Sequence, residues 1–92
     1  MIQSFKHKGL ELFFKTGRKS GIQAIHVKQL QLILGRLNAA TSPDDMNLPG
    51  LSLHPLTGIR AKIWSVHVSG NWCVTFRFNG AHAEVVDYED YH

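Results

Sequence analysis

Residues 62–88 read KIWSVHVSGNWCVTFRFNGAHAEVVDY, and this stretch decides the fold. It contains three segments that favour strands because they are rich in β-branched and aromatic residues and largely alternate with a period of two: residues 62–68, 71–78 and 83–88. Ser69-Gly70 joins the first two segments. Asn79-Gly80, the strongest short hairpin signal in the chain, joins the second to the third. The stretch therefore predicts a three-stranded antiparallel meander.

The residues before the meander predict helices. Leu10, Phe13 and Phe14 fall at helical spacing, and Gly17 is placed to end that helix. For a second helix, Ser20-Gly21-Ile22-Gln23 has the form of a capping box. Behind it runs an apolar stripe made of Val27, Leu30, Ile33, Leu34 and Leu37.

Two short segments complete the predicted architecture. Residues 2–5 alternate as a strand at the edge of the sheet would, and residues 51–54 read as a brief strand stopped by Pro55. We predict one α+β domain, residues 1–92, in which two N-terminal helices pack on a twisted antiparallel sheet.

Composition limits the class of protein. At 92 residues and 43% hydrophobic content, the chain can bury one thin core. Cys73 is the only cysteine, which excludes an internal disulfide and suits a reducing compartment. With no signal peptide and no membrane-spanning run recognisable, we expect a soluble cytoplasmic protein. The net charge of +3 favours an anionic partner such as nucleic acid, although an ordinary solvated basic surface explains it equally well.

Alternation also sorts the two faces of the sheet. One face takes the apolar side chains, which are Trp64, Val66, Val68, Trp72, Val74, Phe76 and Phe78. The other face takes Ser65, His67, Cys73, Thr75 and Arg77. This second face could be covered by a nucleic acid, but alternation alone favours an ordinary solvated face. Cys73 is then an exposed thiol, and His7, His26 and His82 are expected at the surface.

Several short motifs gain meaning from their order and spacing. His54 precedes Pro55 in residues 53–58 (LHPLTG), Arg60 follows, Asn71-Trp72 comes later, and residues 88–92 read YEDYH. Together with the opening residues 2–10, this pattern resembles the HigB-type toxins of the RelE/ParE superfamily of toxin–antitoxin modules, over the whole chain.

The resemblance implies an activity and partners as well as the fold. Such a protein is an endoribonuclease that enters the ribosomal A site on the small subunit and cuts translated mRNA. Its inhibitor is a HigA-type antitoxin with a helix-turn-helix domain, and operator DNA is contacted only through that antitoxin.

Metal-independent RNA cleavage needs a base for the 2′-OH, an acid for the 5′-oxygen and positive charge for the phosphorane. Imidazoles titrate near neutral pH, and carboxylates and phenols also move or orient protons. Our hypothesis places His54, Asp90, Tyr91 and His92 in the catalytic site, with Arg77 and Arg60 as phosphate-binding residues. Which group is base and which is acid stays open. No metal or cofactor is expected, because no His pair has metal-ligand spacing with carboxylate support.

Three departures from the family pattern bear on activity. Cys73, Ser69 and Thr57 stand where family members commonly carry basic residues. We therefore expect a weaker nuclease, in which Arg77 could replace one missing charge. Two other functions stay open: a ParE-like, non-nucleolytic toxin acting on DNA gyrase, and a degenerate toxin that only binds its antitoxin.

Overall fold

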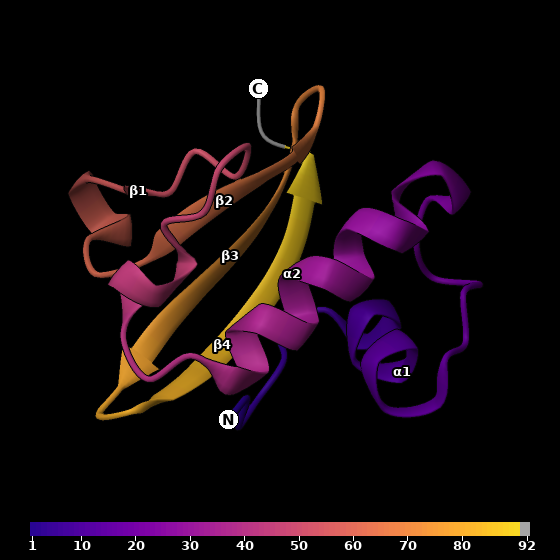
Figure 1. Ribbon diagram of the computed structural model, residues 1–92, viewed down its shortest axis with the longest axis horizontal. Helices are drawn as coiled ribbons and strands as arrows, with labels where there is room; N and C mark the ends of the chain where they lie inside the picture. Colours follow the sequence, from indigo (N-terminus) through magenta and orange to yellow (C-terminus); the bar gives the residue numbers. More distant parts are fainter. Residues whose placement is uncertain (91–92) are drawn as a thin grey trace.

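Two helices cover one face of a four-stranded antiparallel sheet in the computed structural model, which describes residues 1–90 (Figure 1). The helices are α1 (Lys8–Thr16) and α2 (Val27–Ala39), and the strands are β1 (His54–Pro55), β2 (Trp64–Ser69), β3 (Trp72–Asn79) and β4 (His82–Asp90). The short 3₁₀ helices are η1 (Ala24–His26), η2 (Pro43–Met46) and η3 (Gly58–Arg60). The strands lie in the order β1-β2-β3-β4, so the predicted α+β fold is confirmed.

Helix α1 ends where the sequence predicted. Gly17 adopts the left-handed conformation (φ 80°), and its N–H donates to the Phe13 carbonyl. The start of the helix has a cap that the sequence analysis did not identify. His7 Nδ1 accepts the Leu10 N–H at 2.9 Å, which satisfies one of the unpaired amides of the first turn.

Helix α2 begins later than predicted. Gln23 has extended backbone and makes no side-chain capping bond, so the predicted capping box at residues 20–23 is wrong. A tertiary contact explains the difference, because a Cβ atom on Gly9 would lie only 2.8 Å from the Gly21 carbonyl oxygen. Residues 20–23 are thus packed as a loop against the start of α1. The apolar stripe is confirmed, since Leu30, Ile33, Leu34 and Leu37 are all buried.

The edges of the sheet differ slightly from the prediction. Ile2 and Phe5 form isolated parallel bridges with Ala83 and Val86 of β4, so the N-terminal segment does join the sheet edge. Strand β1 includes Pro55, which pairs with Trp64, and the predicted strand ending before Pro55 has the wrong bounds. An edge strand tolerates proline because the missing N–H costs no ladder hydrogen bond on its outer side.

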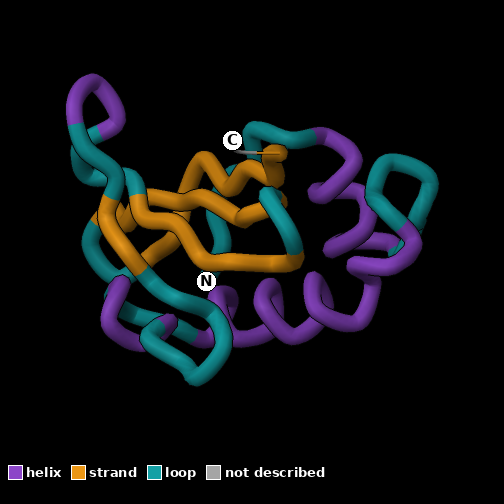
Figure 2. Tube along the Cα trace, turned by 90° about the horizontal axis from the view of Figure 1, so that it is seen from above, coloured by secondary structure: helices purple, strands orange, loops and turns teal. Residues whose placement is uncertain are grey.

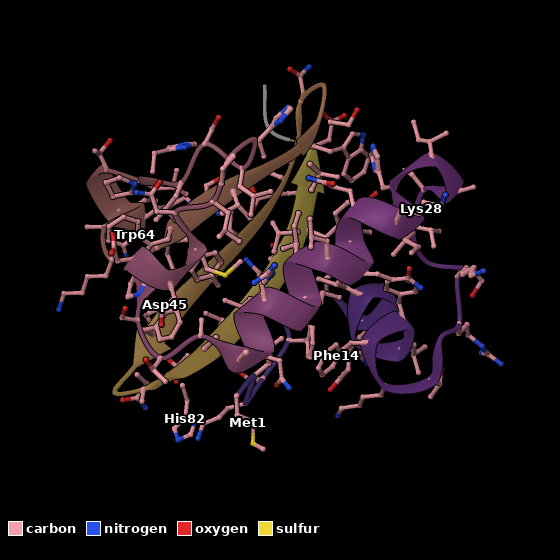
Figure 3. The ribbon with its side chains drawn as sticks, viewed as in Figure 1. Met1, Phe14, Lys28, Asp45, Trp64 and His82 are labelled. Carbon is pink, nitrogen blue, oxygen red and sulfur yellow. The ribbon has the colours of Figure 1, made fainter. Side chains whose placement is uncertain are left out.

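The core lies between the helices and the sheet, as Figure 2 shows. It joins the α2 stripe to the inward residues of the strands, which include Val66, Val74, Phe76, Val86 and Tyr88. Phe14 of α1 packs against its margin (Figure 3), and Trp64 and Trp72 also pack against the core. Within residues 1–90, no helix has both the length and the apolar character to span a membrane.

The sheet face away from the helices, called here the open face, is not the solvated surface that alternation predicted. Ser65, Cys73 and Thr75 are only 3%, 7% and 2% exposed, so the expectation of an exposed Cys73 thiol is wrong. The segment before β2 runs along the edge of that strand, where the Leu51 carbonyl accepts the His67 N–H at 2.6 Å, and the Arg60 side chain reaches across the open face to Glu89 of β4. Only part of the open face is left for a ligand.

Candidate active site on the open face

Polar side chains form two neighbouring rows across the open face. The first row follows paired Cα positions through all four strands: His54, Ser65, Thr75 and Asp87. The second row crosses β2, β3 and β4: His67, Cys73 and Glu89. Side chains in paired antiparallel positions point to the same face, so the rows gather chemistry-bearing groups from distant parts of the sequence.

His54 stands at the rim of a hollow of about 130 Å³. The hollow is lined by His54, Ser65, His67, Gly70, Asn71, Trp72 and Cys73. His54 is exposed, and its Nδ1 lies 2.9 Å from the Ser52 carbonyl oxygen. A carbonyl only accepts, so in the neutral ring Nδ1 carries the proton and Nε2 keeps its lone pair. His54 is therefore held in the tautomer that a general base requires.

His67 and Asn71 belong to the same hollow, although the sequence-based site did not include them. His67 Nε2 donates to the Gly70 carbonyl at 3.1 Å, which orients this ring too. Alternation had already placed His67 on this face, and Asn71 is part of the Asn-Trp motif. Among the described lining residues there is no Lys or Arg, and the neutral His67 ring already gives its one N–H to Gly70, so the Asn71 amide is the donor that can meet an anionic group.

Arg60 is brought to the open face, where it pairs with Glu89. Its guanidinium donates to both carboxylate oxygens, at 3.0 and 2.7 Å, and the Thr75 hydroxyl donates to the same carboxylate at 3.0 Å. The Arg60 hydrogen bond, assisted by that of Thr75, lowers the pKa of Glu89 despite its partial burial. Glu89 was absent from the sequence-based site because nothing local predicts an ion pair spanning 29 residues.

Arg77 is not brought to this hollow. It lies opposite Glu84 near the β3–β4 hairpin and forms an ion pair with that carboxylate through both Nε and Nη2. Trp72 lies five positions before Arg77 on β3, about 17 Å away at the usual strand rise. Arg77 therefore lies away from the end of β4, whereas the sequence analysis had grouped it with the predicted catalytic residues there.

Asp90 ends β4 opposite Trp72, at the same end of the sheet as the His54 hollow. Alternation assigns its side chain to the face of Trp72, whereas Glu89 shares the face of Cys73. His54 and Asp90 are thus three strands apart, about 14 Å across the sheet, and the structure does not bring them together. Tyr91 and His92, the other two predicted catalytic residues, lie outside the residues that the structure describes.

The end of β4 is anchored from the helix side by a cluster of rings. Tyr88 stacks on Trp72 with centroids 4.6 Å apart, and its hydroxyl lies 2.6 Å from His26 Nδ1. His26 is only 2% exposed, so its predicted surface position is wrong. Burial raises the pKa of Tyr88, which keeps the phenol protonated near neutral pH. Tyr88 and Glu89 together fix the two positions before Asp90 from opposite faces.

Comparison of the sequence with known proteins identifies its family. A family model described as a RelE-like toxin of the type II toxin–antitoxin system HigB matches residues 3–92. The Endoribonuclease HigB of Proteus vulgaris is 44% identical over 92 residues, covering the whole of both chains. The chain belongs to the HigB-like toxin family. Membership of a type II toxin–antitoxin family implies an antitoxin partner.

In this HigB-like toxin, the three residues that the sequence analysis expected to replace basic ones have distinct surroundings. Ser69 and Thr57 are exposed, whereas Cys73 is buried on the floor of the His54 hollow. Burial is the main reason that the pKa of the Cys73 thiol is raised, so the group stays neutral. Within residues 1–90, no three His, Cys, Asp or Glu side chains gather closely enough to hold a metal ion.

Proposed function

We propose that this HigB-like toxin is an endoribonuclease that cleaves translated mRNA in the ribosomal A site. The observation that carries the proposal is the 44% identity, over the full length of both chains, to a protein named as an endoribonuclease. The exposed His54, with Nδ1 hydrogen-bonded to a backbone carbonyl, supports it from the structure.

The proposed chemistry begins at His54. Its Nε2 takes the proton of a ribose 2′-OH, and the 2′-oxygen attacks the adjacent phosphorus. The 5′-oxygen leaves with a proton supplied by Tyr91 or His92, because Asp90 lies three strands from His54 and on the other face of the sheet. The products are a 2′,3′-cyclic phosphate and a 5′-hydroxyl, and the scheme needs no metal.

Charge on the phosphorane is stabilised by donors around the hollow. The Asn71 amide lines it, and the Arg60 guanidinium adds positive charge to the open face. Arg77, paired with Glu84 near the hairpin, binds a more distant phosphate in this scheme. With Cys73 neutral, cleavage is slower than in a relative that has a cation at that position.

The proposed partners follow from the same assignment. The mRNA is presented by the small ribosomal subunit, which supplies the positioning that a 92-residue protein lacks. A HigA-type antitoxin with a helix-turn-helix domain inhibits the toxin, and operator DNA is bound only through that antitoxin.

Primer extension on mRNA in a bacterial translation extract tests the proposal, with ribosomes present and absent and with N-terminally tagged protein. In-frame cuts should require ribosomes. His54→Ala and His92→Ala should lower the cleavage rate by about 10²–10⁴-fold, the usual contribution of a general acid or base. His82→Ala, on the exposed β3–β4 hairpin, is the matched control and should cleave at the wild-type rate.

Two results would reject the nuclease. An intact message together with growth arrest that survives His54→Ala would assign the gyrase-type, non-nucleolytic activity. An intact message without growth arrest, in protein that still binds its antitoxin, would assign the degenerate toxin.

A further inference from the structure

A second hollow opens on the open face, and of its lining residues the chemistry proposed above uses only Arg60. Its volume is about 280 Å³, and it is lined by Lys6, Ile59, Arg60, Ile63, Thr75, Val85 and Asp87. Ile63 directly precedes Trp64, which Figure 3 labels on the η3 side of the molecule. Ligand pockets usually start at about 300 Å³, so this hollow suits one small group.

Its apolar wall contains two unusual residues. Ile59 of η3 is fully exposed at 105%, although it borders a hollow that already contains Ile63. Val85 has φ 47°, a left-handed conformation that β-branched residues rarely adopt, and its N–H donates to Ser4 Oγ at 2.9 Å. Such strain persists where the surroundings enforce it, and it clusters at binding sites.

A β-bulge places Val85 in this wall. Thr75 pairs with Asp87 and Arg77 pairs with Glu84, so two residues of β4 oppose one residue of β3. Bulges of this kind redirect a side chain and are frequent beside functional sites. The two apolar residues, Ile59 and Val85, therefore reach the hollow from different segments.

The polar groups at this hollow carry both signs of charge, and Arg60, which also lines it, donates to the Glu89 carboxylate. Asp87 Oδ1 accepts the Tyr88 N–H at 2.9 Å, and its carboxylate as a whole only accepts. The Thr75 hydroxyl gives its proton to Glu89, so it offers lone pairs to the hollow. Lys6 is exposed at the rim and carries a positive charge. A ligand that matches Asp87, Thr75 and Lys6 thus carries hydrogen-bond donors and has a negative charge nearby.

We propose that this hollow binds one base of the RNA substrate, a base that carries an amino group, with the adjoining phosphate at Lys6. The proposal rests on the ribonuclease function proposed above and adds a specificity site to it. Guanine offers two adjacent donors to a carboxylate, whereas adenine and cytosine offer their exocyclic amines. Uracil presents carbonyl oxygens on both sides of its one donor, and the Asp87 carboxylate repels them.

The position of the hollow fits a nucleotide near the one that is cut. Thr75 lies two strands from His54 in the same row, about 10 Å across the sheet. The Arg60–Glu89 pair and Thr75 stand between the two hollows. A single strand crossing the open face would place one ribose at His54 and a neighbouring base against Ile59 and Val85.

Amide NMR titration of the ¹⁵N-labelled full chain with GMP, AMP, CMP and UMP tests this without any cleavage. GMP, AMP and CMP should shift the amides of Thr75, Val85 and Asp87 with saturation, and UMP should bind several-fold more weakly. Asp87→Asn should lower GMP affinity by about tenfold, the typical effect of losing a charge-assisted hydrogen bond, and should remove the discrimination against UMP.

Two further variants separate base from phosphate. Lys6→Ala should weaken all four nucleotides equally, and Ile59→Ser should weaken them without changing their order. Asp44→Asn, an exposed acidic position on η2, is the charge-matched control and should change nothing. Unchanged GMP affinity in Asp87→Asn, shifts confined to the His54 hollow, or no saturable binding up to 20 mM would each overturn the proposal.

The nucleotide titration and the primer-extension assay can succeed or fail independently of each other. If primer extension shows no cleavage but the titration behaves as expected, the ribonuclease function fails and the nucleotide site stands. If cleavage depends on His54 but Asp87→Asn leaves the relative rates at different codons unchanged, the base site fails and the nuclease stands.

Discussion

Replacing Glu89 by glutamine tests whether the Arg60–Glu89–Thr75 contacts stabilise the fold. The substitution keeps the shape of the side chain but removes the charge that accepts the two Arg60 hydrogen bonds and the Thr75 hydroxyl. Hydrogen bonds to charged groups contribute about 1.5–3 kcal/mol each when buried. The Arg60 and Glu89 side chains are 36% and 23% exposed, and solvent screening reduces that value. We expect the free energy of unfolding to fall by about 1–2 kcal/mol at pH 7.

The direction of the Glu89 pKa shift determines how the stability loss in Glu89→Gln depends on pH. The pKa of Glu89 in the folded protein lies below its ordinary value of 4.5, so the folded state favours the ionised group. The stabilisation is therefore complete above about pH 4.5 and disappears as the pH falls through the folded-state pKa. The difference between wild type and Glu89→Gln should stay constant well above pH 4.5 and shrink as the pH falls below it.

Urea unfolding followed by tryptophan fluorescence at pH 7 and at pH 3 measures both quantities. Thermal unfolding gives a second measure, with about 4–8 °C for each kcal/mol in a domain of this size. Glu11→Gln, in the exposed pair with Lys15 on α1, is the control and should cost less than about 0.5 kcal/mol. Equal stability of Glu89→Gln and wild type at pH 7, or an equal deficit at both pH values, would refute the reasoning.

Three further changes test other parts of the structure. Gly9→Ala forces a Cβ atom to within 2.8 Å of a backbone oxygen and should lower the unfolding free energy by about 2 kcal/mol or more. Gly35→Ala in α2 meets nothing within 4 Å and should raise the unfolding free energy by about 0.5–1 kcal/mol. The urea midpoints of the two variants should therefore move in opposite directions. Tyr88→Phe removes the hydrogen bond to His26 and should cost about 1 kcal/mol in the same assay, with unchanged secondary structure by circular dichroism. Cys73, whose pKa is raised by burial, should react with iodoacetamide at pH 8 at least tenfold more slowly in the folded protein than in urea, and equal rates would contradict its placement.

The sequence by itself determined the elements that depend on neighbouring residues. The β2–β3–β4 meander follows from alternation and the Asn79-Gly80 turn, and the end of α1 follows from Gly17. The order of the His54, Asn71-Trp72 and C-terminal motifs indicated the family that the comparisons show. These features act over a few residues, or through motif order along the chain, so no knowledge of the tertiary structure is needed to recognise them.

The tertiary structure decided what the polar residues contact. Arg60 pairs with a residue 29 positions away and His26 contacts one 62 positions away, and no local pattern specifies either partner. The β-bulge adds one residue to β4, and this changes the face of the sheet on which Val85 lies, because side chains alternate with a strict period of two. The close approach of Gly21 to Gly9 likewise accompanies a loop at residues 20–23, so α2 begins only at Val27. Local periodicity predicts which side chains face the core, but contacts between distant segments determine which polar groups of the other face can meet a substrate.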